Sequence, residues 1–93
     1  MYVIGIYDMN TETKEGRKRL QKMLKIFRIY LHHVQKSVFE GEISESSCEE
    51  LKQKIQKNID PDKDTVILFK MNNPKWIEKD FFGYKDDVTS NIL

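Results

Sequence analysis

An aspartate at the end of a short apolar run is the residue best placed to do chemistry in this sequence. The run Tyr2–Tyr7 combines two tyrosines with β-branched residues, a composition typical of a buried strand, and Asp8 follows it directly. We expect the strand to hold this carboxylate rigidly at the edge of a sheet. The plainer alternative is an aspartate that caps the next turn or helix.

Two copies of this aspartate would have a chemistry that one copy lacks. If a two-fold axis passes near Asp8, two unpaired carboxylates repel until one is protonated or a cation binds between them. A hard ion such as Mg²⁺ prefers carboxylate and water ligands, and it can polarise a phosphodiester. Asp8 is therefore the candidate metal ligand and catalytic residue.

A concentration of positive charge follows Asp8. The whole chain has a net charge of only +1, yet between Lys14 and Arg28 seven basic residues face a single acid, Glu15. At about 100° per residue on a helix, six of them share one broad arc, while Arg19 lies on the opposite shoulder. The six are Lys14, Arg17, Lys18, Lys22, Lys25 and Arg28. Such an arc can bind a phosphate backbone, and the alternative is an ordinary solvated helix face.

Other chemically capable residues predict no site. His32 and His33 are adjacent, so in a strand they point to opposite faces and cannot share one zinc ion. Cys48 lies on an apolar helical stripe, which predicts a small core residue. The sequence offers no Ser/His/Asp constellation and no glycine-rich phosphate loop.

The elements that position these residues follow from periodicity. Helical spacing of apolar residues predicts amphipathic helices around residues 14–29 and 46–59, with capping chemistry at 10–13 and at Ser46 and Ser47. Residues 33–44 read as extended, either as one bent strand or as two in a hairpin. Thr65–Phe69 predicts a second buried strand. With two strands in the middle, the order is βαββαβ, a ferredoxin-like α+β fold with two helices on one face of an antiparallel sheet.

Both end strands are apolar on both faces, whereas a sheet with one face in water should alternate apolar and polar residues. We therefore expect a partner subunit to cover the second face, as a homodimer. The ferredoxin-like domain is expected at residues 1–74, with a C-terminal tail at 75–93.

Composition sets the outer bounds. Ninety-three residues, 39% hydrophobic and 33% charged, fit one globular domain. No apolar run reaches the roughly 18 residues of a membrane span, and the first residues lack the pattern of a signal peptide. A single cysteine suits a reducing compartment, so we expect a cytoplasmic protein without a membrane partner.

Three features taken in order resemble a known family. These are Tyr7-Asp8 closing the first strand, a basic helix with Arg17 and Arg19-Leu20, and the stretch from Val34 to Gly41. Together they resemble the second CRISPR-associated protein family, the small endonuclease-like factor of CRISPR adaptation. The similarity spans residues 2 to about 70, and Gln35–Gly41 is its most specific part. His33 stands where some members carry arginine, and Asn10 and Thr11 stand where many carry acids.

The resemblance implies a ferredoxin-like homodimer that works with the CRISPR integrase during spacer acquisition. It also implies that the tail at 75–93 adds a strand to the partner subunit or contacts the integrase. It also implies a Mg²⁺-dependent endonuclease acting on single-stranded RNA or duplex DNA, with one metal-binding Asp8 from each subunit. Tyr7, Arg17, Arg19 and Phe39 match positions that the family associates with activity or substrate contact.

Two other interpretations remain open at this stage. One is a structural adaptor that holds duplex DNA on its basic helices for the integrase, with Asp8 structural. The other is an unrelated ferredoxin-like regulatory domain that binds a small ligand, which would leave the basic arc and the Gln35–Gly41 stretch unexplained.

Overall fold

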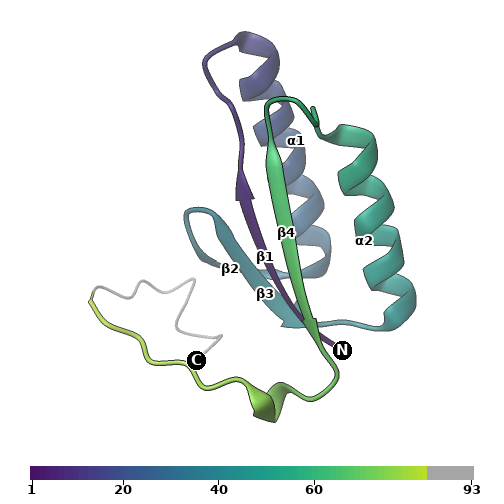
Figure 1. The fold of residues 1–93 in the computed structure, drawn as a ribbon, viewed down its shortest axis with the longest axis vertical. Helices are drawn as coiled ribbons and strands as arrows, with labels where there is room; N and C mark the ends of the chain where they lie inside the picture. The colour runs from purple at the N-terminus through teal and green to yellow at the C-terminus, as the bar shows by residue number, and fades with distance from the viewer. Residues whose placement is uncertain (84–93) are drawn as a thin grey trace.

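Residues 1–83 are described by the structure, a computed structural model with one four-stranded antiparallel sheet and two α-helices in that range. The order of the elements is β1 (Tyr2–Asp8), α1 (Lys14–Tyr30), β2 (His32–Gln35), β3 (Val38–Glu42), α2 (Glu45–Asn58), β4 (Thr65–Met71) and the 3-10 turn η1 (Pro74–Trp76). In space the strands lie in the order β2-β3-β1-β4, and both helices pack on one side of the sheet (Figure 1). The predicted ferredoxin-like α+β fold is confirmed.

The middle extended segment is a hairpin rather than one bent strand. Residues 36 and 37 form the turn between β2 and β3, and the pairing is irregular between His33 and Gln35. The Tyr7 side chain secures this turn, because its hydroxyl donates to the carbonyl oxygen of Lys36 at 2.5 Å. The backbone N–H of Tyr7 also donates to the carbonyl oxygen of Ser37.

Helix caps account for where the two helices begin. Thr13 caps α1 by accepting a hydrogen bond from the N–H of Gly16, within the segment expected to supply it. The capping prediction for α2 was wrong by two or three residues: Ser44 is the cap, and its hydroxyl accepts from the N–H of Ser47. Ser46 and Ser47 lie inside the first turn, because the chain leaves β3 at Glu42 and has room for only a short connection.

The core lies between the helices and one face of the sheet. An aromatic stack runs through it, with the Phe27 ring 5.2 Å from that of Phe39 and 5.8 Å from that of Tyr7. A Cβ at Gly5 would lie 2.6 Å from the Phe27 ring, so the absent side chain makes room for the stack. Cys48 is 3% exposed in this core, as the sequence predicted.

No helix covers the opposite face of the sheet (Figure 1), and this face carries apolar side chains. Ile4 pairs with Phe69 and Ile6 with Ile67 across β1 and β4, which places all four on one face. Ile67 is 47% exposed and Phe69 is 49% exposed. We call these four residues the open face.

The C-terminal segment leaves β4 and runs beneath the β2–β3 hairpin in the view of Figure 1. After η1, residues 77–83 contain no strand or helix. The remainder of the predicted tail, residues 84–93, lies outside the described residues, so the added strand and the boundary at residue 74 stay predictions. In the part that the structure describes, no helix is both long and apolar enough to traverse a bilayer.

Candidate functional site

Asp8 lies at the rim of the open face. It is the last residue of β1, pairs with Thr65 of β4 and is exposed to solvent. Because side chains alternate along a strand, Asp8 projects from the same face as Ile4 and Ile6, while Tyr7 points into the core. Within residues 1–83, no hydrogen bond or ion pair engages its carboxylate. Nothing in that range supports the alternative of an aspartate that caps a turn or helix.

Tyr7 and Phe39, the aromatic candidates, lie inside the core. Tyr7 is 7% exposed, Phe39 is fully buried, and their ring centroids are 6.3 Å apart. Burial raises the pKa of the Tyr7 hydroxyl, with a smaller opposing effect from Arg28. The His33 ring stacks on Phe39 at 4.6 Å. Both aromatic residues therefore support the hairpin and the end of β1, and their predicted part in activity stays a prediction.

The side chains of the two candidate arginines, Arg17 and Arg19, point in different directions, because residues two apart on a helix lie on different faces. Arg17 is exposed and donates to the carbonyl oxygen of Thr11 at 3.2 Å. Arg19 turns the other way and forms an ion pair with Asp64, in which Nε donates to Oδ2 at 2.7 Å. The structure thus places Arg17 beside the basic arc and separates Arg19 from it.

Asp64 is a residue that the sequence reasoning missed. Its side chain is 0% exposed, although it lies in the loop between α2 and β4. The guanidinium of Arg19 and two backbone N–H groups hold its pKa down, from an ordinary 3.8 to about 2. The available signal was only its position directly before an apolar strand, since a carboxylate that is buried at such a place needs hydrogen-bond partners.

The predicted basic arc is present on α1. A shallow groove of about 500 Å³ follows the helix surface, and five of its six lining residues belong to the predicted arc. The lining residues are Lys14, Arg17, Lys18, Gln21, Lys22 and Lys25. Arg28 is also exposed on this helix but does not line the groove. From Lys14 to Lys25 the helix rises about 16 Å, over which one DNA strand presents about five phosphates.

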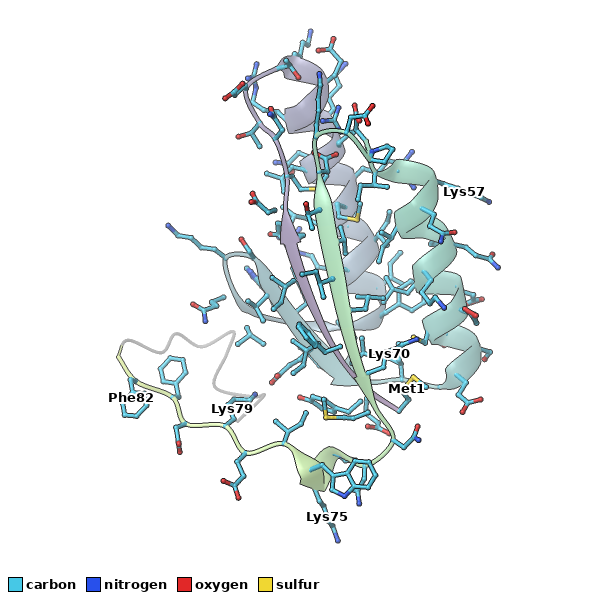
Figure 2. The ribbon with its side chains drawn as sticks, viewed as in Figure 1. Met1, Lys57, Lys70, Lys75, Lys79 and Phe82 are labelled. Atoms are coloured by element: carbon cyan, nitrogen blue, oxygen red, sulfur yellow. The ribbon has the colours of Figure 1, made fainter. Side chains whose placement is uncertain are left out.

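A second buried carboxylate, Glu40, was also missed. It faces the same side as Ile4, its partner across the sheet, and is only 2% exposed. Lys79 of the C-terminal segment covers it through an ion pair, and Figure 2 shows that residue on the chain leaving β4. Burial, together with the neighbouring Glu40, raises the pKa of Tyr2 to about 12. The segment after η1 is therefore attached beside the open face.

Residues 1–83 of one copy do not supply a full set of side-chain ligands for a metal ion. Among residues 1–83, no group of three or more His, Cys, Asp or Glu side chains converges on one point. A single exposed carboxylate with water ligands binds a divalent cation weakly. Asp8 therefore fits such an ion better when a second carboxylate, from beyond residues 1–83 of the same copy, joins it.

The fold and these positions define a class: small ferredoxin-like domains with a basic first helix and an exposed carboxylate at the end of the first strand. Residues 1–79 match the family described as CRISPR associated protein Cas2. The CRISPR-associated endoribonuclease Cas2 of Fusobacterium nucleatum is 43% identical over 93 residues, covering 100% of this chain and 87% of that protein. The CRISPR-associated endoribonuclease Cas2 2 of Moorella thermoacetica is 41% identical over 98% of this chain and all of that protein.

A solved structure agrees with the sequence comparisons. The crystal structure of Streptococcus pyogenes Cas2 at pH 6.5 superposes with a TM-score of 0.72 and 33% identity. That alignment covers 85% of this chain and 98% of the crystallised one. The chain belongs to the CRISPR-associated protein Cas2 family, and the resemblance drawn from Asp8, the basic helix and the Gln35–Gly41 stretch is confirmed.

Proposed function

We propose that this chain is a Mg²⁺-dependent endonuclease that acts as a homodimer in the cytoplasm during CRISPR spacer acquisition. The single observation that carries the proposal is the exposed Asp8 at the rim of an uncovered apolar sheet face. The names of the Fusobacterium and Moorella relatives, both endoribonucleases, support a nuclease activity.

The homodimer follows from the open face. Four large apolar side chains of β1 and β4 share this face, and two of them remain about half exposed in the single chain. Contiguous apolar surface of this kind is characteristic of protein interfaces. A two-fold axis pairs the open face with itself, and the proposal places this axis along the strands, so that the Asp8 residues of both copies lie at one rim.

The metal site is proposed between the two copies. Each subunit contributes the carboxylate of Asp8, an oxygen ligand of the type that Mg²⁺ prefers. A bound Mg²⁺ ion would supply Lewis-acid polarisation of a scissile phosphate. The chain's own part is to hold each carboxylate at a fixed strand end, where β1 pairs with β4.

Nucleic acid would bind through the groove on α1. The groove is lined by lysine, arginine and glutamine without any aromatic side chain. Cations contact phosphates irrespective of base sequence, whereas sequence-tolerant binding of single strands usually adds aromatic stacking. The groove therefore suits a phosphate backbone. It supports duplex DNA as a ligand, while RNA remains the proposed substrate of cleavage.

A second candidate function is a catalytically silent adaptor that holds duplex DNA for the CRISPR integrase. The observation that favours it is the same basic groove, combined with the absence, among residues 1–83, of any cluster of three or more metal-ligating side chains. In this case Asp8 contributes to the interface, and binding persists without cleavage.

A cleavage assay separates the two. Purified protein is incubated with labelled single-stranded RNA or duplex DNA, with Mg²⁺ or with chelator, beside Asp8→Asn. Asp62→Asn is the matched control, because Asp62 is an exposed aspartate in the α2–β4 loop. The nuclease proposal requires metal-dependent cleavage that Asp8→Asn loses and Asp62→Asn keeps. Binding of duplex DNA without cleavage by any of the three proteins identifies the adaptor.

A further inference from the structure

The carboxylate of Asp64 joins three separate segments of the chain. Oδ2 accepts from Nε of Arg19 at 2.7 Å and from the N–H of Asp60 at 3.0 Å. Oδ1 accepts from the N–H of Asn10 at 3.0 Å and from Nη2 of Arg19 at 3.3 Å. Four donors from α1, the β1–α1 loop and the α2–β4 loop thus occupy all the acceptor sites that a carboxylate offers.

The segment anchored by this carboxylate begins directly after Asp8. Asn10 lies two residues further on, and Met9 between them is only 9% exposed. The carbonyl oxygen of Asn10 approaches α1 at Gly16: a Cβ added to Gly16 would lie only 2.0 Å from that oxygen. Helix α1 therefore packs closely against the loop. The β1–α1 loop is therefore fixed from two sides immediately after Asp8.

The same carboxylate also adjoins the other strand that carries Asp8. Thr65, the residue after Asp64, is the cross-strand partner of Asp8. The end of β1 therefore pairs with the start of β4. Asp64 holds both the loop that follows β1 and the loop that precedes β4.

Net stability does not by itself explain a buried ion pair. The Asp64 side chain is fully buried while that of Arg19 is 20% exposed, and removing the Asp64 carboxylate from water costs free energy that an apolar side chain of similar volume would not. Such pairs are best attested where they fix one geometry among several. The geometry fixed here is that of the loop next to Asp8.

We propose that Asp64 is a positioning residue, which with Arg19 holds the β1–α1 loop and thereby sets the direction of the Asp8 carboxylate. This inference rests on the function proposed for Asp8. It also gives Arg19, a position linked to activity by resemblance, a role through Asp64 rather than through contact with substrate.

The test compares Asp64→Asn with wild type and with Asp62→Asn, which removes the same charge from the same loop. Amide hydrogen exchange is measured at Asn10, the Asp8 carboxyl carbon is observed by NMR with and without Mg²⁺, and cleavage is followed at a temperature where all three proteins are folded. In Asp64→Asn we expect faster exchange at Asn10, a shifted Asp8 carboxyl signal, and kcat reduced about 10- to 100-fold with KM unchanged. Asp62→Asn should match wild type throughout.

A purely stabilising role for Asp64 predicts a different pattern. The melting temperature of Asp64→Asn would fall while its Asn10 exchange and Asp8 carboxyl signal stayed at wild-type values, and that result overturns the proposal. If wild type itself does not cleave, the nuclease proposal fails, while the two NMR measurements still decide the positioning role. If Asp64→Asn does not fold, Arg19→Lys, which keeps the charge but removes the two-point contact, is judged by the same measurements.

Discussion

The two faces of the sheet are built from alternate residues of the same strands, yet only one is covered. Toward the helices, the buried rings of Tyr7 and Phe39 stack with that of Phe27, and Gly5 leaves room for them. Away from them, Ile67 and Phe69 remain about half exposed, with the Asp8 carboxylate at the rim. The covered face holds the core of the single chain, and the open face is the surface on which the proposed homodimer depends.

The largest effect is expected from a charge placed on the open face. Phe69→Glu loses apolar burial in both copies of a two-fold interface, about 3–6 kcal/mol in total, so the dimer dissociation constant should rise about 10²- to 10⁴-fold. Analytical ultracentrifugation measures it. Ile29→Glu is the control, because Ile29 is 65% exposed on α1 rather than on the sheet. An unchanged dimer in Phe69→Glu would mean that the open face is not the interface.

A change on the covered face should affect folding instead of association. Gly5→Ala would put a Cβ 2.6 Å from the Phe27 ring. Overpacking of this kind costs about 1–3 kcal/mol, which lowers the melting temperature by roughly 5–20 °C in a domain of this size. Chemical denaturation gives the free energy of unfolding. A melting temperature equal to that of wild type would show that the aromatic stack is loosely packed.

The basic groove lies on the helix layer, apart from both faces of the sheet. Lys18→Glu with Lys25→Glu should weaken duplex DNA binding about tenfold or more and reduce the salt slope by about one for each lost phosphate contact. Fluorescence anisotropy across a salt series measures both quantities. The matched control is Lys57→Glu with Lys63→Glu, since both lysines are exposed on or after α2. An equal loss of DNA affinity in the two double variants would show that overall charge, rather than the groove, determines binding.

The smallest effect concerns acid. The lowered pKa of Asp64 means that its carboxylate contributes stability above its ordinary pKa of 3.8, and that this contribution disappears as the pH falls toward about 2. The difference in melting temperature between wild type and Asp64→Asn should therefore shrink by a few degrees between about pH 5 and pH 2. Thermal melts at several pH values test this. A difference that is constant with pH would show that Asp64 is not ionised with a lowered pKa.

Local pattern was enough to predict the elements but not their long-range partners. Apolar spacing predicted α1 but left its end near Ile29 open, and the residues of β1 and β4 predicted a sheet that is apolar on both faces. The role of Asp64 could not be predicted, because its partners Asn10 and Arg19 are 54 and 45 residues away. Nothing in the spacing of Arg17 and Arg19 says which of them meets a buried carboxylate. The same limit hid Glu40, whose partner Lys79 is 39 residues away.

The claim that two Asp8 carboxylates act together can be tested by mixing subunits. Wild type and Asp8→Asn are combined in varying ratios under conditions that allow subunit exchange, and Mg²⁺-dependent cleavage is measured for each mixture. If one site needs both carboxylates, activity falls with the square of the wild-type fraction, to about a quarter in an equal mixture. Activity that falls in direct proportion, to about a half in the equal mixture, would contradict the shared site and assign one independent Asp8 to each chain.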